Sequence, residues 1–266
     1  MMQGSVEEQR AHAKGLKLHL REVDVDGSTL RIVTLRSATT ARFSTNYFHD
    51  TWHILTDREG VFVLGRLLWG LAFQRLPGTA VLIDGEHLVT TPFDGDRADP
   101  ILLLPAELTR TDARLFGRLK QRLRKREPGK IIRWHTFGLP RACSERERLP
   151  RWDRSSKERV EKVGGFVCYS ATADLLRLQA LSIYGMRSCK DTSWHYLDWS
   201  RHPNGEVQVF RDFRSKVSAA AVARQRVIGD KALISSEGER ARIHREADAG
   251  AARARTARGC DPKEKR

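Results

Sequence analysis

Hydrophobic and polar residues alternate along residues 16–34, with a break at Asp26-Gly27. Alternation with a period of two is typical of a strand that buries one face, and Asp-Gly between two such runs is a strong signal for a tight turn. This stretch therefore predicts a β-hairpin. Similar runs predict two more hairpins, one over residues 81–89 with its turn at Asp84-Gly85-Glu86, and one over residues 194–210 with its turn at His202-Pro203-Asn204-Gly205.

The middle of the chain, residues 101–137, combines two short apolar runs with an amphipathic stretch between them. Residues 101–104 are apolar and lie between two prolines, which is typical of a buried strand. Leucines recur every four residues from Leu115 to Leu123, which predicts a helix with one apolar stripe opposite its Arg and Lys residues. Residues 131–137 resume the strand pattern. Strand, helix and strand in succession are compatible with a parallel crossover unit.

Three other stretches have the spacing of helices. Residues 47–57 carry large apolar side chains three and four positions apart, which predicts a short helix. Residues 61–74 are apolar on nearly all sides and predict a buried helix. After a strand at residues 164–169, a strongly apolar helix is expected, with Ser170 or Thr172 as its N-cap.

These elements predict a single mixed α/β domain over residues 16–212, with a central strand–helix–strand unit flanked by hairpins. Residues 1–15 are expected to be a flexible leader, without the cationic start and apolar core of a secretory signal. Residues 213–266 are a basic, Ala- and Arg-rich tail. It contains a predicted surface helix at residues 215–227 and a disordered or conditionally helical end. No apolar run reaches the ~20 residues of a membrane-spanning helix, so a soluble, cytoplasmic protein is predicted.

The charge of the chain is unevenly distributed. There are 48 Lys and Arg against 33 Asp and Glu, for a net charge of +15. Residues 101–165 hold 18 basic and 8 acidic residues, residues 211–266 hold 15 and 8, and residues 1–100 hold 11 and 13. Concentrated positive charge attracts polyanions such as nucleic acids. An Arg-rich composition of the kind found in proteins from GC-rich genomes gives the same total, so the charge alone leaves both interpretations open.

The basic helix and the strand after it are the main candidate for a binding surface. Arg and Lys neutralise phosphates and release counterions, and aromatic rings stack on unpaired bases. This pattern favours a protein that binds DNA or RNA mainly through phosphate contacts, with the tail adding affinity. The alternative is the solvated face of an ordinary Arg-rich helix. The candidate residues are Arg114, Arg118, Arg122, Lys125, Arg126, Lys130, Arg133, Trp134 and Trp152.

A second candidate is a metal site on the helix predicted at residues 47–57. His49, His53 and Asp57 are four residues apart, so on a helix they would project from one face. Two imidazoles at this spacing can chelate zinc, as in metal-dependent hydrolases and nucleases, where a Glu after the first His is the general base. Asp50 takes that position here with a shorter side chain. A polar helix face with two ordinary histidines is the alternative. Further ligand candidates are His195, Asp198 and His202.

Other standard chemistries are absent from the sequence. It contains neither the Gly-x-x-x-x-Gly-Lys-Ser/Thr nor the Gly-x-Gly-x-x-Gly phosphate motif, and no Gly-x-Ser-x-Gly nucleophile motif. No cofactor is indicated other than a divalent metal. Ser170 and Thr172, at a strand-to-helix junction, have the position of phosphate ligands, although capping explains them equally well.

No two of the four cysteines form a Cys-x-x-Cys pair, which favours reduced thiols. A non-catalytic scaffold for an acidic protein partner is the third functional hypothesis.

Overall fold

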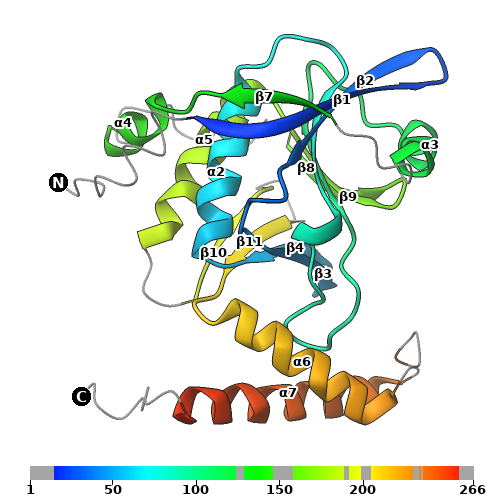
Figure 1. The fold of residues 1–266 in the computed structure, drawn as a ribbon, viewed down its shortest axis with the longest axis vertical. Helices are drawn as coiled ribbons and strands as arrows, with labels where there is room; N and C mark the ends of the chain where they lie inside the picture. The colour runs from blue at the N-terminus through cyan, green and yellow to red at the C-terminus, as the bar shows by residue number, and fades with distance from the viewer. Residues whose placement is uncertain are drawn as a thin grey trace.

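The computed structural model describes residues 15–123, 129–145, 158–188, 192–198, 205–229, 234 and 236–257. In these residues the chain forms two mixed β-sheets with helices packed against them, so the predicted mixed α/β class is confirmed (Figure 1). The strands are β1 (Leu16–Val25), β2 (Ser28–Leu35), β3 (Phe43–Phe48), β4 (Thr51–Thr56), β5 (Thr79–Ile83), β6 (Ile101–Pro105), β7 (Lys130–Trp134), β8 (Arg159–Val163), β9 (Phe166–Ala171), β10 (Ser193–Tyr196) and β11 (Gly205–Val209). The helices are α2 (Arg58–Ala72), α3 (Ala113–Leu123), α4 (Gly138–Ser144), α5 (Ala173–Gly185), α6 (Phe213–Ile228) and α7 (Glu237–Ala257), with short 3-10 turns η1 (Gly85–His87) and η3 (Met186–Ser188).

The larger sheet has seven strands in the order β7-β1-β2-β5-β6-β9-β8. Strands β1 and β2 form the hairpin predicted from the sequence. Asp26 and Gly27 at its turn have positive φ angles of 53° and 78°, which favour Asp and Gly there. Strands β8 and β9 form another hairpin through Gly164 and Gly165. Strands β7 and β8 are therefore the two edges of this sheet.

The two faces of the larger sheet are covered by different helices. Successive residues of a strand point to opposite faces, so Leu103 of β6 faces α2 and α5, whereas Leu102 and Leu104 face α3. On that second face, Phe116 and Leu119 of α3 close a smaller core. Because both faces of β6 are buried, its sequence is continuously apolar, as the pattern at residues 101–104 predicted.

Close packing joins α2 to α5 and to the edge of the sheet. A Cβ at Gly65 would lie 2.8 Å from the Cβ of Tyr184 on α5, so glycine allows the two helices to approach. Gly70, one turn further along α2, lies under the ring of Trp134 at the end of β7, where a Cβ has no room. The edge strand β7 is therefore packed directly on α2.

The smaller sheet has the order β10-β11-β4-β3 and lies between α2 and the C-terminal helices (Figure 1). Strands β3 and β4 form a hairpin, so the helix predicted over residues 47–57 is wrong. The turn is at His49-Asp50, with φ angles of 48° and 56°. The aromatic and β-branched residues of this segment are compatible with a strand as well as with a helix. The parallel pairing of β4 with the distant β11 favours the strand. The hairpin predicted over residues 194–210 is confirmed by β10 and β11.

Strand β6, helix α3 and strand β7 follow one another as predicted, but they are not a parallel crossover unit. The neighbours of β6 are β5 and β9, so β7 joins the far edge of the sheet, antiparallel to β1. The hairpin predicted over residues 81–89 is also wrong. After β5 the chain forms η1, and the amide of Val89 donates to the carbonyl of Phe43 in the smaller sheet. The choice of strand partners depends on contacts distant in sequence, which local patterns do not contain.

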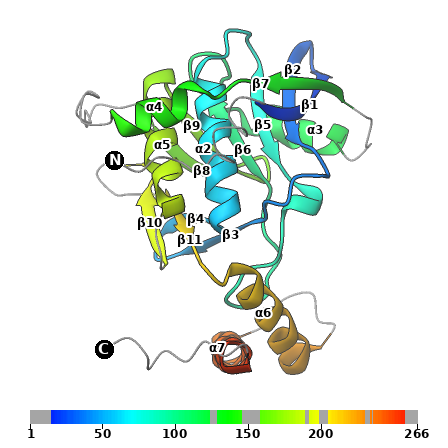
Figure 2. The same cartoon turned by 60° about the vertical axis from the view of Figure 1, so that its left-hand side comes forward.

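The C-terminal helices α6 and α7 form a hairpin below the two sheets (Figure 2). Ala220, Ile243 and Ala247 lie in the contact between them. Ser236 caps α7 by accepting a hydrogen bond from the amide of Glu239 (3.2 Å). Helix α6 confirms the surface helix predicted at residues 215–227, and the described part of the remaining tail is helical. Within the described residues, no helix is long and apolar enough to cross a membrane.

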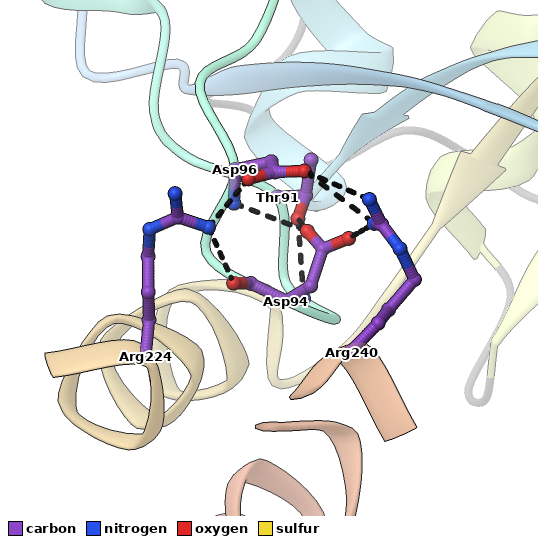
Figure 3. A network of polar contacts seen from close by, with 5 residues as sticks. All are labelled: Thr91, Asp94, Asp96, Arg224 and Arg240. Carbon is purple, nitrogen blue, oxygen red and sulfur yellow. Dashed lines mark hydrogen bonds and ion pairs between the residues drawn. The ribbon is translucent and has the colours of Figure 1, made fainter. Parts of the chain in front are cut away.

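A network of Arg and Asp side chains joins this helical hairpin to the loop after η1 (Figure 3). Asp94 is 6% exposed and accepts hydrogen bonds from Thr91 and Arg240. Asp96 pairs with Arg224 and, at 3.4 Å, with Arg240. Asp94 is thus buried and Asp96 half-buried, although the sequence of this loop is polar. We call this set of five residues the Arg–Asp clamp.

Replacing Gly70 with Ala should lower the free energy of unfolding by roughly 1–3 kcal/mol, because the new methyl group overlaps the Trp134 ring. Gly117→Ala is the matched control: that position on α3 is open, and Ala is the better helix former by about 0.5–1 kcal/mol. Urea unfolding followed by circular dichroism measures both variants. Stabilisation by both substitutions would contradict the packing of β7 on α2.

Replacing Asp94 with Asn should make opening of the α6–α7 hairpin easier by roughly 1–3 kcal/mol, because a buried hydrogen bond to a charged group is lost. Native-state hydrogen exchange should then show weaker protection of amides in α6 and α7, with those of β6 unchanged. Arg242→Gln removes an exposed pair with Glu246 and should change protection by no more than about 0.5 kcal/mol. Unchanged protection of α6 and α7 in the Asp94 variant would mean that the Arg–Asp clamp does not hold the hairpin.

Candidate nucleic-acid interface

Helix α3 is attached to the sheet by its apolar face, which leaves its arginines outside. Phe116 and Leu119 are completely buried. The first turn is capped by Asp112, which accepts a hydrogen bond from the amide of Leu115 at 2.8 Å. A helix held in this way presents residues four apart along one outer line. On α3 these are Arg114, Arg118 and Arg122.

The positive charge of α3 is partly balanced at its first half. Arg118 forms an ion pair with Asp26 in the β1–β2 turn. A surface hollow of about 430 Å³ lies between this turn and α3, and Asp26, Arg114 and Arg118 are among the residues that line it. Arg122, near the end of the helix, is exposed and has no ion-pair partner among the described residues. Of the three outer arginines, Arg114 and Arg122 therefore carry charge without an ion-pair partner among the described residues.

Strand β7 carries unbalanced charge at the edge of the sheet. Lys130 and Arg133 are exposed, and Arg133 is directly opposite Lys17 on β1, so these two side chains share a face. That face is the one opposite to Trp134. In the part of the chain that the structure describes, Lys17, Lys130 and Arg133 make no ion pair.

Trp134 is not available for stacking on a base. It is 8% exposed, and its ring covers Gly70 of α2. Its role in a binding surface was predicted from its neighbours in the sequence, but the alternation of the strand turns it toward the core while Arg133 points outward. The remaining candidates lie outside the described residues: Lys125, Arg126, Trp152 and His202.

Four other aromatic side chains surround the end of β7. The rings of His135 and Phe137 are 5.3 Å apart, and those of Trp69 and Phe73 on the last turns of α2 are also 5.3 Å apart. Trp69 also borders Gly138, the residue after Phe137. Sequence reasoning missed Trp69 and Phe73 because α2 is apolar on nearly all sides. Their four-residue spacing at the end of the helix was the available signal.

The three residues of the predicted metal site have separate roles. His49 is in the β3–β4 turn, and the Nε2 atom of His53 on β4 lies 2.9 Å from a carboxylate oxygen of Glu206 on β11. Asp57 caps α2 by accepting a hydrogen bond from the amide of Gly60 at 2.8 Å. The helical face on which they were expected to meet does not form. No group of three or more His, Cys, Asp and Glu side chains in the described residues is arranged to hold a metal ion.

His195 belongs to a buried polar network between the two sheets. Its Nε2 is 2.7 Å from Oε1 of Gln179 on α5, and the amide nitrogen of Gln179 donates to Glu158 at 3.1 Å. Tyr169 of β9 donates its hydroxyl to the same carboxylate at 3.1 Å. Burial first, and then the carboxylates of Glu158 and Asp198, raise the pKa of Tyr169 well above its usual value. A tyrosine held neutral in this way ties β9 to α5 and β10.

At the strand-to-helix junction of residues 169–172, a carboxylate of the chain itself takes the place that a phosphate would have. The first amide of α5, that of Ala173, donates to the carboxylate of Glu107 at 3.2 Å, and Thr172 makes no side-chain cap. The chain's own carboxylate thus takes an anion position at this helix N-terminus. Cys168, earlier on the same strand β9, is a free thiol whose burial raises its pKa to about 12, so it is not a reactive thiolate.

Comparison with protein-family models, with curated proteins and with solved structures finds no match to this chain.

Glu206→Gln should lower the free energy of unfolding by roughly 1–2 kcal/mol near neutral pH, because a buried charged hydrogen-bond acceptor is lost. Burial would raise the pKa of Glu206, but hydrogen bonds from His53 and Gln208 and the charge of His53 lower it below 4.5. The stability that the carboxylate contributes is therefore present above pH 4.5 and is lost as the pH falls through the lower pKa of the folded state.

The stability difference between wild type and Glu206→Gln should accordingly shrink between about pH 6 and pH 3, as measured by urea unfolding. Glu161→Gln, which changes a more exposed carboxylate 3.9 Å from Arg159, should show little difference at either pH. A difference for Glu206 that does not change with pH would contradict the pairing of its ionised form.

Proposed function

We propose that the protein binds nucleic acid, mainly through contacts between phosphates and its Arg and Lys side chains. The observation that supports this most directly is a set of exposed cations on β1, α3 and β7 that have no acidic partner within the described residues. A cation already paired with a carboxylate must give up that pair to bind a phosphate, whereas an unpaired cation need not. The set consists of Lys17, Arg114, Arg122, Lys130 and Arg133.

The way in which these cations are held also favours phosphate binding. All of them except Lys130 lie on the outer side of a helix or of two paired strands whose other side is anchored by buried side chains such as Phe116 and Trp134. Because the backbone under them is already ordered, contact with a polyanion costs little conformational entropy beyond that of the side chains themselves. Contacts of this kind read the phosphate backbone, so the proposed binding has little dependence on base sequence.

The same cations would attract an acidic protein, which is the alternative. The two partners differ in their response to salt. Nucleic acid carries condensed counterions, so the logarithm of its affinity falls linearly and steeply with the logarithm of salt concentration. Nucleic acid that copurifies with the protein and is released by salt supports the proposal, whereas a salt-sensitive acidic protein in its place supports the scaffold alternative.

Arg133→Gln should weaken nucleic-acid binding and reduce the slope of log affinity against log salt by about 0.7–0.9, the contribution of one phosphate contact. Fluorescence anisotropy with a labelled oligonucleotide, between about 50 and 200 mM salt, measures both quantities. Arg159→Gln is the matched control. Its side chain is 71% exposed on β8, the opposite edge strand of the same sheet, and it should leave the slope unchanged.

Two results would count against this proposal. Undetectable binding by the wild-type protein at the lowest salt concentration would remove nucleic acid as the partner. An equal effect of the two substitutions would show that β7 is not part of the binding surface.

A further inference from the structure

Two pairs of rings lie at and beside the end of β7, Trp69 with Phe73 and His135 with Phe137, and we call these four residues the aromatic platform. The Trp69 and Phe73 rings meet edge to face at 61°, and the His135 and Phe137 rings are inclined by 30°. Trp69 links the two pairs, because its ring lies against Gly138, next to Phe137. Phe73 is 48% exposed and Phe137 is 62% exposed, so each presents much of its ring to solvent.

Isolated apolar side chains are ordinary on a protein surface, but several gathered at one place mark a binding surface. The aromatic platform is also held in position before any ligand arrives. The buried Trp134 fixes the chain that leads to His135 and Phe137, and α2 fixes Trp69 and Phe73. Binding to such a surface requires little ordering of side chains.

The charge around the aromatic platform indicates what covers it. The guanidinium of Arg177, which also pairs with Asp174, lies 5.8 Å from the centre of the Phe73 ring. Lys130 and Arg133 precede the platform on β7 and have no ion-pair partner among the described residues, whereas Arg141, with its side chain 81% exposed, follows it on α4 and pairs with Glu145 at 3.2 Å. An apolar partner helix would leave Lys130 and Arg133 without a partner of opposite charge. A nucleotide has both a flat ring to stack on the aromatic side chains and a phosphate for the cations.

We infer that the aromatic platform stacks unpaired bases, so that the bound nucleic acid is a single strand. In a duplex the faces of the bases are covered by their neighbours in the stack, and proteins reach the base edges alone through the grooves. The rings of the platform therefore have a partner in a single strand and none in an undistorted duplex. This inference rests on the proposed function, since the cations of β7 hold the backbone while the rings hold the bases.

Phe137→Ala and Phe73→Ala should each weaken binding of an oligothymidylate of about 20 nucleotides by roughly 5–100-fold, the effect of removing one stacking ring. The affinity for a duplex of equal length and the salt slope should stay close to those of the wild-type protein. Phe137→Tyr keeps the ring and should bind as the wild type does. Trp194→Ala is the matched control, because this ring is 57% exposed on β10 of the smaller sheet.

The possible outcomes separate this inference from the proposal on which it rests. If both Phe→Ala variants bind the oligothymidylate normally while Arg133→Gln weakens binding, the inference fails and phosphate binding stands. If the wild-type protein prefers the duplex, the inference of base stacking also fails, and the proposal of phosphate binding stands. If the wild type binds neither probe at low salt, both fail. Circular dichroism confirms folding of each variant, and Phe137→Tyr keeps the test valid if an Ala variant is unstable.

Discussion

The contact between Trp134 and Gly70 fixes the edge strand β7 on helix α2, and the basic and aromatic surface depends on it. A side chain at position 70 would push the indole ring away, so the two elements can approach only with glycine there. The joint is strengthened by Arg66 of α2, which is 4% exposed and donates its Nε hydrogen to Thr136 at 3.0 Å. Burial lowers the pKa of this guanidinium to about 10. Lys130, Arg133 and the four rings take their positions from this packing.

Which cations remain exposed without an ion-pair partner depends on how the fold pairs the charges, more than on how many cations the chain contains. Arg114, Arg118 and Arg122 are equivalent in the sequence, four residues apart on one helix face. The fold places Asp26 beside Arg118, while Arg114 and Arg122 have no ion-pair partner among the described residues. Exposed pairs contribute little to stability, but they reduce the local potential that a polyanion experiences.

The C-terminal tail depends on the rest of the chain in a different way. Helices α6 and α7 share a contact built from small side chains, such as Ala220 and Ala247, which offers little apolar area for a stable hairpin by itself. The buried Asp94 and the loop around it supply the additional attachment through Arg224 and Arg240. A segment whose composition favours disorder is thus helical where it has a docking partner.

The sequence by itself determined the elements whose local signals agree. The Asp-Gly hairpin, the buried helix α2, the apolar strand β6 and the amphipathic α3 follow from turn chemistry and hydrophobic period, and these act within a few residues. Tertiary structure decided everything that depends on a distant partner. It made residues 47–57 a hairpin by pairing β4 with β11, sent β7 to the far edge of the sheet, and buried Trp134 while exposing Phe137. Sequence neighbours of Arg133 were expected to act with it, but which side chains share its surface depends on packing between elements, and that information is spread over the whole chain.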